Sequence, residues 1–400
     1  MSKVVRIAAL FSHPIQYFAP LFRALASRPD VDLTTYLCSR QGLEEYVDPG
    51  FGKAVSWDIP LLEGYRYKFL PNLRRGQGAR GFFSLINPAI VRELQRERYD
   101  ALWVHGYMHA TNWLAFLAAR VTDTPILLRG ESNLLRPRPW WVRLVKGVVL
   151  RALLSQVSAC LYIGTRNREY YEHYGVPDER LFFTPYCVDN AFFQAQADHF
   201  RPQRNKLREE FGIVDDRPVI LFCGKLIPKK QPLRLLEAFA QVRRDFPCAL
   251  LYVGDGALRS EIEERIELEN IPDVRITGFL NQSEVPKAYT AADVLVLPST
   301  WEGGDSETWG LVVNEGMNFG LPIVVTDQVG CAPDLVREGE NGYVVPYHSV
   351  EELEKALEKL VADPERRYAF GQRSLEIIQG WDIDHTVEGI VHAAKLVGET

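Results

Sequence analysis

Two glutamates in the last third of the chain, Glu307 and Glu315, are separated by seven residues. Glu307 lies in a Gly-containing turn after an apolar run at 293–297, which predicts a buried parallel strand. A strand that leads through such a turn into a helix places backbone N–H groups at the carboxyl edge of a sheet, where an anionic ligand can bind. A helix over 310–318 would hold Glu315 a little over two turns from Glu307, so the two carboxylates can face one ligand from its two ends.

Glu315 is suited to accept hydrogen bonds from both hydroxyls of a ribose, because a carboxylate offers several acceptor positions. The alternative is an exposed glutamate on the helix surface. Its neighbours make much of the helix apolar, so a charge at this position needs a partner. These neighbours are Val312, Val313, Met317 and Phe319.

Two lysines, Lys225 and Lys230, follow another apolar run, which ends before Gly224. Cations at a strand-to-helix turn can neutralise a diphosphate. The alternative is a solvated group of lysines at a helix start, where the helix dipole opposes positive charge. The lysines alone do not decide between these two interpretations.

Two further turns follow predicted strands of the second half. Residues 253–256 form a Gly-containing turn that lacks the G-x-G-x-x-G fingerprint of dinucleotide sites, and Asp255 fits a plain turn or helix-capping residue. Phe279 and Leu280 come just after a strand end. An aromatic ring there can border a planar base, although a contact at the rim of the sheet explains it equally well.

Polar residues also follow several predicted strands of the first half: His13, His105, His109, Arg129 and Glu131. Each alone fits a polar residue at a loop rim. Because the carboxyl ends of parallel strands share one edge of a sheet, their common location favours an acceptor pocket. His105 and His109 could form a metal pair, but no third ligand lies at a matching spacing, so we predict no metal.

Residues 134–155 are rich in basic and apolar side chains and contain no acidic residue. Trp140 and Trp141 with the aliphatic residues supply an apolar side. This pattern suits docking on an anionic membrane surface through 136–151. The alternative is a crossover helix that packs on its own sheet. The basic residues are Arg136, Arg138, Arg143, Lys146 and Arg151.

Short apolar strands alternate with helices over 4–185 and again over 219–345, which predicts two parallel sheets covered on both faces. Four hundred residues exceed one ordinary core. We therefore expect an α/β fold with two Rossmann-like α/β/α domains that face a central cleft. The predicted domains are 1–195 and 196–380, and a C-terminal helix in 381–400 can pack back on the N-terminal domain.

The composition excludes several classes of protein. A net charge of −6 argues against a nucleic-acid binder, which would usually be basic. The six cysteines are scattered without a C-x-x-C pair, which indicates core residues in a reducing compartment. The chain starts directly in a predicted strand, and no apolar run approaches the ~20 residues of a membrane span. We expect a cytoplasmic protein, either soluble or peripheral on the inner face of a membrane.

Taken together, the motifs of the second half resemble those of the retaining GT-B-fold glycosyltransferases, specifically glycosyltransferase family four. The resemblance covers 218–346 most strongly and rests on four segments. They are the Glu-seven-residue-Glu pattern at 307–315 with its continuation to 327, the Gly224-Lys225-Leu226 turn with Lys230, and the turns at 253–256 and 339–342.

The resemblance implies a role for each matching residue of the donor half. Glu315 would hold the ribose of a nucleotide-sugar, and Lys225 and Lys230, next to Gly224, would bind its diphosphate. Glu307 would contact the transferred sugar. The start of the following helix, at Gly310, Leu311 and Val312, would assist the lysines. Phe279 and Leu280 would border the base, and Asp305 would lie on the donor.

In the first half the resemblance implies that His109 and Arg129 act with Glu307 in catalysis, and that His13, Tyr17 and Glu131 serve the acceptor. This half departs from the family pattern. Its first loop, residues 13–17, is not Gly-rich, and Arg129 to Ser132 stand where the family commonly has a histidine. The acceptor contacts therefore rest on weaker grounds than the donor contacts.

The function implied is a retaining, metal-independent glycosyltransferase of the hexosyltransferase type, without a cofactor. It would move a sugar from a UDP- or GDP-linked donor to a saccharide or lipid-linked acceptor in cell-surface polysaccharide or glycolipid synthesis. Two alternatives stay open. One is a GT-B-fold nucleotide-sugar epimerase, and the other is a non-catalytic sugar-nucleotide-binding partner of an assembly complex.

Overall fold

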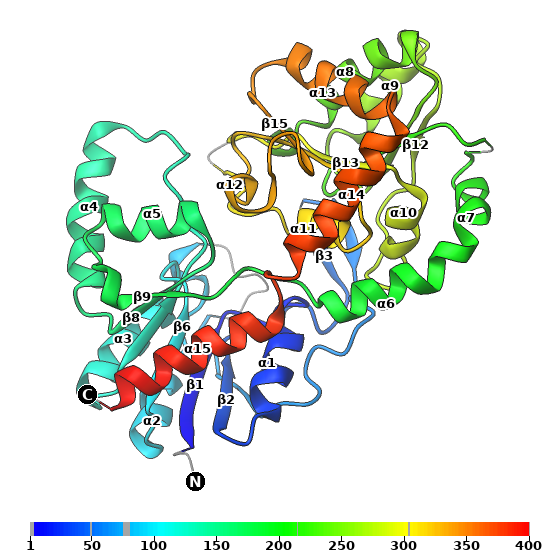
Figure 1. Ribbon diagram of the computed structural model, residues 1–400. Coiled ribbons are helices and arrows are strands. Elements are labelled where there is room, and N and C mark those ends of the chain that lie inside the picture. Colours follow the sequence, from blue (N-terminus) through cyan, green and yellow to red (C-terminus); the bar gives the residue numbers. More distant parts are fainter. Residues whose placement is uncertain (1–3, 49, 75–80, 214, 303–304, 400) are drawn as a thin grey trace. The chain divides into compact units, whose positions relative to one another are not determined.

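Two parallel sheets organise the chain, each in its own structural unit. The computed structural model describes residues 4–48, 50–74, 81–213, 215–302 and 305–399. Unit 1 comprises residues 1–46, 59–186 and 382–400, and unit 2 comprises 47–58 and 187–381. Each unit is an α/β assembly of parallel strands covered by helices, as the alternating pattern predicted (Figure 1).

The sheet of unit 1 has seven strands in the order β5-β2-β1-β6-β7-β8-β9, all paired in parallel. The strands are β1 Val5–Phe11, β2 Val31–Leu37, β5 Tyr67–Phe69, β6 Ala101–His105, β7 Ile126–Arg129, β8 Ala159–Tyr162 and β9 Leu181–Phe183. The helices are α1 Phe18–Ser27, α2 Ala89–Arg96, α3 Ala110–Val121, α4 Trp140–Leu154, α5 Thr165–His173 and α15 Ile383–Gly398, with short 3₁₀ turns η1 Phe82–Ser84 and η2 Asp178–Arg180.

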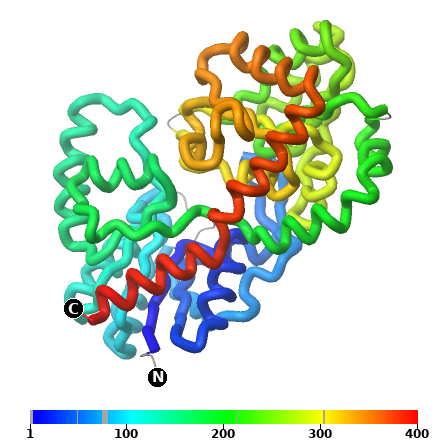
Figure 2. Tube along the Cα trace, viewed as in Figure 1, coloured from blue at the N-terminus to red at the C-terminus, as the bar shows by residue number. Residues whose placement is uncertain are grey.

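The central strands of unit 1 are apolar along nearly their whole length because helices cover both faces of the sheet. In β6, for example, the first four residues are buried. On one face, α2 to α5 cover the core that includes Leu102, Val104 and Leu128. On the other, α1 contacts α15, and Lys395 of α15 pairs with Asp30 at 2.6 Å. The C-terminal helix thus belongs to unit 1, and Figure 2 shows it beside the start of the chain.

The sheet of unit 2 has six parallel strands in the order β12-β11-β10-β13-β14-β15. The strands are β10 Val219–Cys223, β11 Ala249–Val253, β12 Val274–Ile276, β13 Val294–Leu297, β14 Ile323–Thr326 and β15 Gly342–Val345. The helices are α6 Asn190–Phe200, α7 Arg204–Glu210, α8 Pro232–Asp245, α9 Arg259–Leu268, α10 Val285–Ala291, α11 Leu311–Met317, α12 Ala332–Leu335, α13 Val350–Val361 and α14 Pro364–Ile378, with η3 Arg201–Gln203 and η4 Pro228–Lys230.

The strand order of unit 2 reverses direction at β10. The chain adds β11 and β12 on one side of β10 and then returns to place β13, β14 and β15 on the other. In open parallel sheets, loops diverge at such a reversal and leave a crevice where ligands bind. The loops that follow β10 and β13 are those that carry the predicted lysines and glutamates.

The division into units differs from the predicted boundary at 195/196 in two places. Residues 187–195 belong to unit 2. So do residues 47–58, which include most of a small two-stranded sheet made by β3, Tyr46–Asp48, and β4, Lys53–Val55. Sequence analysis placed both segments with the N-terminal domain, because neither carries a strand of either large sheet.

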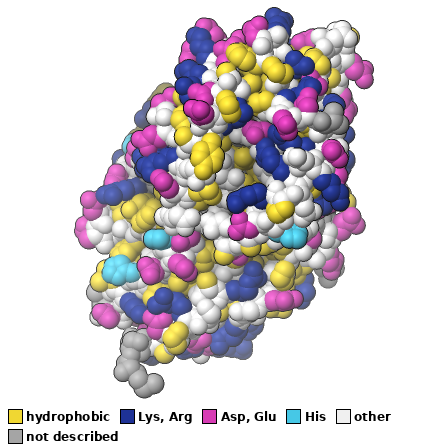
Figure 3. Space-filling view, turned by 45° about the vertical axis from the view of Figure 1, so that its right-hand side comes forward, with side chains coloured by type: hydrophobic (Ala, Val, Ile, Leu, Met, Phe, Trp, Pro, Cys, Tyr) yellow, Lys and Arg dark blue, Asp and Glu magenta, His cyan; other side chains and the backbone are white. Residues whose placement is uncertain are grey.

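Acidic and basic side chains are interspersed over the face shown in Figure 3. No helix in the described part of the chain combines the length and the apolar character that a membrane crossing requires.

Candidate functional site

The loops after β10, β11 and β12 are joined by backbone hydrogen bonds at the carboxyl edge of the unit 2 sheet. The Gly224 N–H donates to Val253 O, and the Gly254 N–H donates to Gly278 O, both at 2.9 Å. The Leu226 N–H donates to Asp255 O at 2.9 Å. These bonds hold the three loops, which include the turns at 224–226 and 253–256, as one continuous edge.

Gly254 is required where two of these loops cross. A Cβ atom at this position would lie 1.8 Å from the carbonyl oxygen of Gly224, and its φ of +145° is a conformation that other residues rarely adopt. The glycines of the two turns therefore serve close packing of backbone on backbone. The Asp255 carboxylate between them pairs with Lys53 at 2.5 Å and with Arg259 at 3.0 Å, so it does more than the plain turn residue that sequence analysis favoured.

The loop after β10 also meets the loop after β13, across the point where the strand order reverses. The Thr300 N–H donates to Lys229 O at 2.9 Å. The Lys229 ammonium donates to Asp305 Oδ2 at 2.8 Å, and Lys230 forms an ion pair with Glu307. The fold thus brings together two elements that are about 70 residues apart in sequence.

Glu307 is held in a nearly buried ion pair. Its side chain and that of Lys230 are both about seven-eighths buried, and Ser299 Oγ donates to Glu307 Oε2 at 3.3 Å. The adjacent backbone is fixed by a tight crossing, since a Cβ at Gly330 would lie 1.8 Å from Thr308 O. Glu307 is therefore a fixed carboxylate at the strand reversal. Sequence analysis anticipated Lys230 and Glu307 but not their pairing.

Glu315 is inside the protein, in the middle of α11, and is only 4% exposed. The Tyr289 hydroxyl donates to Glu315 Oε2 at 2.6 Å. Burial raises the pKa of Tyr289 well above its usual value, and the nearby carboxylate of Glu315 raises it further, so this hydroxyl keeps its proton. The buried carboxylate has the partner that its apolar surroundings required, although the sequence did not indicate Tyr289.

Helix α11 begins at Leu311, and Gly310 precedes it with a φ of +104°. A Cβ at Gly310 would lie 2.7 Å from Leu297 Cδ2, so a glycine lets the chain turn against β13. The N–H groups of Leu311 and Val312 lie in the first turn, where no earlier carbonyl of the same helix can accept them. The predicted start near residue 309 or 310 is correct to within two residues.

Lys225 and Phe279, both predicted donor residues, contact a segment from the first half of the chain. Lys225 Nζ donates to Asp48 Oδ1 at 2.7 Å. The Phe279 ring packs edge-on against Phe51, with ring centroids 4.9 Å apart. It also packs against the Trp57 ring, with centroids 6.2 Å apart. Leu280, next to Phe279, is half-buried. None of these partners was apparent from the sequence.

Asp305 differs from the other predicted donor residues because its side chain is 71% exposed. Residues 303–304, the glycines that precede it, lie outside the described part of the chain. Burial of the carboxylate raises its pKa, but the bond from Lys229 outweighs this and lowers it below the usual value. Asp305 is therefore a charged residue on the outer side of the loop.

The polar residues predicted for unit 1 gather at the carboxyl ends of β1, β6 and β7, which are adjacent strands. His105 Nε2 lies 3.5 Å from Glu131 Oε1, and the His105 ring stacks on Phe11 with centroids 4.8 Å apart. His13 Nδ1 lies 2.9 Å from Ser12 Oγ. Sequence analysis expected these residues to share one edge, and the sheet order explains why they do.

Of these histidines, His13 and His109 favour their neutral forms. Burial is the main reason that the pKa of His13 is lowered to about 4, with smaller contributions from the neighbouring imidazoles of His109 and His105. Burial also lowers the pKa of His109, against a smaller opposing effect of the Gly81 carbonyl. Neutral imidazoles can accept a proton or a hydrogen bond, as a saccharide hydroxyl would require.

Arg129 and Glu131 carry opposite charges in the same cluster, where Arg129 is buried and Glu131 is half-buried. Burial raises the pKa of Glu131, but the hydrogen bond from His105 and the charge of Arg129 outweigh it, so the pKa is lower than usual. Arg129 is 1% exposed, and its guanidinium lies over the rings of Phe18 and Tyr186 at 5.3 and 5.2 Å. This burial suits Arg129 to hold the cluster in place. Tyr17 is half-buried at the start of α1.

Helix α4 carries the basic and apolar segment that sequence analysis singled out. It packs Leu150, Leu153 and Leu154 into the core of unit 1, as the crossover interpretation requires. Its other side exposes a row of apolar side chains that reaches 75% exposure at Trp140. The crossover interpretation therefore accounts for one side of this helix only. The exposed residues are Trp140, Trp141, Leu144, Val145, Val148 and Val149.

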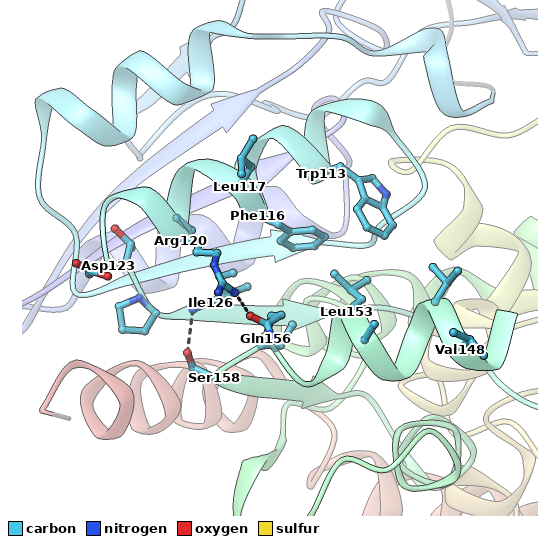
Figure 4. Close-up of a pocket in the computed structure, with 16 residues that line it drawn as sticks. Trp113, Phe116, Leu117, Arg120, Asp123, Ile126, Val148, Leu153, Gln156 and Ser158 are labelled. Atoms are coloured by element: carbon cyan, nitrogen blue, oxygen red, sulfur yellow. Dashed lines mark hydrogen bonds between the residues drawn. The ribbon is translucent and has the colours of Figure 1, made fainter. Parts of the chain in front are cut away.

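Beside this row, α3 and α4 enclose an apolar pocket of about 740 Å³. Figure 4 shows Trp113, Phe116 and Leu117 of α3 on one side and Val148 and Leu153 of α4 on the other. A hydrogen bond between Arg120 and Gln156 crosses one part of it. The exposed apolar surface of α4 thus continues into the pocket.

Lys146 does not join the outward-facing basic residues of α4. Its ammonium lies over the rings of Tyr170 and Tyr174, at 4.9 and 5.8 Å from their centroids. Burial, together with the positive charges of Arg138 and Arg136, lowers its pKa to about 8. Of the five basic residues, Arg143 and Arg151 are exposed, and the other three are half-buried.

Within the described ranges, no group of three or more histidine, cysteine or acidic side chains is arranged to hold a metal ion. The six cysteines are all buried and unpaired with one another as disulfides.

Two family models match the chain, one in each half. The "Glycosyl transferase 4-like domain" matches residues 14–187, and "Glycosyl transferases group 1" matches residues 203–376. The second match includes the lysines and both glutamates of the site described above.

Individual proteins agree with these matches. Alpha-D-kanosaminyltransferase of Streptomyces kanamyceticus is 28% identical over 318 residues, which are 74% of this chain and 80% of the relative. The GDP-mannose-dependent alpha-(1-6)-phosphatidylinositol monomannoside mannosyltransferase of Mycolicibacterium smegmatis is 29% identical over 236 residues, 58% of this chain and 60% of the relative. The crystal structure of Anabaena HepE in complex with UDP and glucose superposes with a TM-score of 0.70 at 17% identity and covers 98% of this chain and 100% of HepE.

The two Rossmann-like sheets and the full-length structural likeness define the class as the GT-B fold. Both halves match glycosyltransferase domains in the expected order. The chain belongs to the group 1 glycosyltransferases, of the family-four type, which confirms the resemblance found in the motifs.

Proposed function

We propose that this glycosyltransferase moves a hexose, with retention of configuration and without a metal, from a UDP- or GDP-linked donor to a saccharide or lipid-linked acceptor. The observation that carries the proposal is the meeting of the loops after β10 and β13 at the strand reversal. There the Lys230–Glu307 pair stands beside the start of α11. Such a crevice is where parallel α/β sheets bind nucleotides.

In this proposal the diphosphate binds to Lys225 and Lys230, and the first N–H groups of α11, at Leu311 and Val312, donate hydrogen bonds to it. The Gly224 turn lets the phosphates approach the backbone. Its φ of +149° favours a glycine, which has no side chain to block that approach. When the bond to the sugar breaks, negative charge develops on the leaving diphosphate. Fixed cations and N–H groups stabilise that charge, which removes the need for a metal.

Glu315 and Glu307 have different proposed tasks. Glu315 accepts the ribose hydroxyls, and the bond from Tyr289 to Oε2 fixes the orientation of the carboxylate. Glu307 contacts the transferred sugar and helps to position it. Because Glu307 is already paired with Lys230, its charge is fixed near the diphosphate before the sugar arrives. Phe279 and Leu280 border the base, and Asp305 lies at the outer side of the donor.

The acceptor side is proposed for the polar cluster of unit 1. Neutral His13 and His109 can accept hydrogen bonds from acceptor hydroxyls, while Tyr17 and Glu131 add further polar contacts. Arg129 holds Glu131 in place. The leaving phosphate oxygen takes the proton from the attacking hydroxyl in the retaining mechanism that we propose.

We also propose that α4 docks on an anionic membrane surface, which would suit a lipid-linked acceptor and synthesis of cell-surface polysaccharide or glycolipid. The support is the exposed apolar row with Arg143 and Arg151, continued by the pocket in Figure 4. Apolar side chains with flanking arginines favour the interface of anionic bilayers. The enzyme would then act as a cytoplasmic, peripheral protein.

A screen of nucleotide-sugars for thermal stabilisation tests the donor proposal, since a ligand that binds the native state raises its apparent stability. We expect a UDP- or GDP-sugar to raise the melting temperature, and Glu315→Ala to abolish that rise. Turnover of the labelled donor then separates the alternatives. A free epimerised donor without acceptor would indicate the epimerase, and binding without turnover would indicate a non-catalytic partner.

A further inference from the structure

Residues 47–58, of which the structure describes all but 49, form a segment that we call the strap. It comes from the first half of the sequence but belongs to unit 2. Its Phe51 and Trp57 rings pack on Phe279, with ring centroids 4.9 and 6.2 Å apart. The strap therefore lies on the residue proposed to border the base.

Polar contacts hold the strap at several points along its length. Lys53 Nζ pairs with Asp255 Oδ2 at 2.5 Å, and Asn281 Nδ2 donates to Ser56 O at 2.6 Å. At the far end the Ser283 N–H donates to Asp58 Oδ2 at 3.2 Å. These contacts tie the strap to the loops that follow β11 and β12.

At its start the strap places a carboxylate on the proposed diphosphate lysine. Lys225 Nζ donates to Asp48 Oδ1 at 2.7 Å. The same oxygen accepts the N–H groups of Gly50 at 2.7 Å and Phe51 at 3.2 Å. Burial raises the pKa of Asp48, but Lys225 and these N–H groups outweigh it and lower the pKa, so the carboxylate is charged at neutral pH.

The backbone of the strap is shaped for this lysine. A Cβ at Gly50 would lie 2.5 Å from Lys225 Cδ and 2.9 Å from its Nζ, so only a glycine lets the lysine lie this close. The ammonium is also 4.8 Å from the centroid of the Phe51 ring, a distance typical of a cation–π contact. Lys225 is thus enclosed by the carboxylate, the backbone and the ring of one short segment.

We infer that Asp48 is an internal competitor of the donor diphosphate and sets the donor affinity of this enzyme. The Lys225 ammonium is enclosed by Asp48, Gly50 and the Phe51 ring, so a phosphate oxygen that approaches it competes with Asp48 Oδ1 for its charge and its N–H donors. Donor binding must therefore exchange a carboxylate for a phosphate, which lowers the apparent affinity by the strength of the pair that is lost. This inference rests on the proposed role of Lys225 in diphosphate binding.

Asp48→Asn tests the inference because it removes the charge and keeps the size of the side chain. We expect the dissociation constants of UDP and GDP, measured by calorimetry, to fall about fivefold, the effect of one partly screened ion pair. Uridine and guanosine, which lack the diphosphate, should bind the variant and the wild type alike. Asp215→Asn is the matched control, since it removes an aspartate paired with Arg217 elsewhere in unit 2.

Three outcomes would overturn the inference, and they differ from failure of the proposed function. If Asp48→Asn binds the diphosphates no more tightly than Asp215→Asn, Asp48 does not compete. If the variant tightens the nucleosides equally, the effect does not pass through the diphosphate. If Lys225→Ala leaves UDP and GDP binding unchanged, Lys225 is not the diphosphate cation. If the wild type binds none of these ligands, the proposed function itself is wrong.

Discussion

The hydrogen bond between Tyr289 and Glu315 gives a quantitative test of the donor site. Tyr289→Phe removes one hydroxyl and leaves the ring, which stacks on Phe319 with centroids 5.2 Å apart, in place. The Glu315 carboxylate, at 4% exposure, would lose the donor at 2.6 Å at a position that bulk water hardly reaches.

The expected cost follows from the charge of the acceptor. A hydrogen bond to a charged group contributes about 1.5–3 kcal/mol, so we expect Tyr289→Phe to lower the free energy of unfolding by about 2 kcal/mol. For a unit of about 200 residues this corresponds to a fall of roughly 4–8 °C in the melting temperature of unit 2. Scanning calorimetry, which can resolve separate transitions of the two units, is the appropriate measurement.

Tyr252→Phe is the matched control. Tyr252 is also fully buried in unit 2, and its hydroxyl donates to a neutral acceptor, Pro232 O, at 2.7 Å. A neutral bond contributes about 1 kcal/mol, so this variant should lose about half as much stability. If Tyr289→Phe costs no more than Tyr252→Phe, then Glu315 is not a charged, buried acceptor and the reasoning is wrong. In a Glu315→Gln background the cost of Tyr289→Phe should fall to that of the control.

Three further predictions follow from the geometry. Glu307→Gln should lower kcat about 100-fold or more in a labelled-donor assay while the donor still binds, and an unchanged kcat would remove Glu307 from catalysis. His13 has a pKa of about 4 in the folded protein, below its unfolded value of 6.5, so the unfolded chain binds more protons between these values. The free energy of unfolding should therefore fall by up to about 3 kcal/mol as the pH drops from about 6.5 to 4. In chemical denaturation, His13→Gln should make this dependence on pH weaker. If the variant shows the same dependence on pH as the wild type, His13 is not the group responsible. Replacing Trp140, Trp141 and Arg143 should reduce sedimentation with anionic vesicles, and salt should weaken the wild-type binding; Lys146→Ala, whose ammonium faces Tyr170, should have a smaller effect.

The strands were the most predictable part of the fold. The apolar run at 293–297, for example, became β13, which begins one residue later at Val294. Strands of a parallel sheet are covered on both faces, so each shows as an uninterrupted apolar run that polar loops delimit. The alternation of such strands with helices is what predicted the two parallel sheets.

Two polar segments were described less well by the sequence. Residues 190–217 are largely polar and charged, and they form α6 and α7. Residues 39–64 are rich in Gly, Asp and Glu, yet they contain β3 and β4 and supply the strap. Both segments gain their structure from contacts with distant parts of unit 2, and such contacts leave no periodic pattern in a polar stretch.

The partners of the site residues could not be predicted for the same reason. Glu315 required a partner because its helix is apolar, but the sequence does not indicate that Tyr289, 26 positions earlier, supplies it. The pattern of hydrophobic residues predicts which positions are buried. It does not predict which polar side chain from another element faces a buried charge.

The charge pairs at the strand reversal show why these unpredicted partners matter for function. Each of the three lysines in the loop after β10 has a carboxylate partner: Asp48 for Lys225, Asp305 for Lys229 and Glu307 for Lys230. The loop therefore carries no excess positive charge with which to attract a diphosphate over a distance. Donor affinity must come from exchanging partners at short range. Of the three carboxylates, Asp48 belongs to a strap contributed by the other end of the chain, so a change in the strap alters affinity without altering the lysines or the glutamates of the family motif.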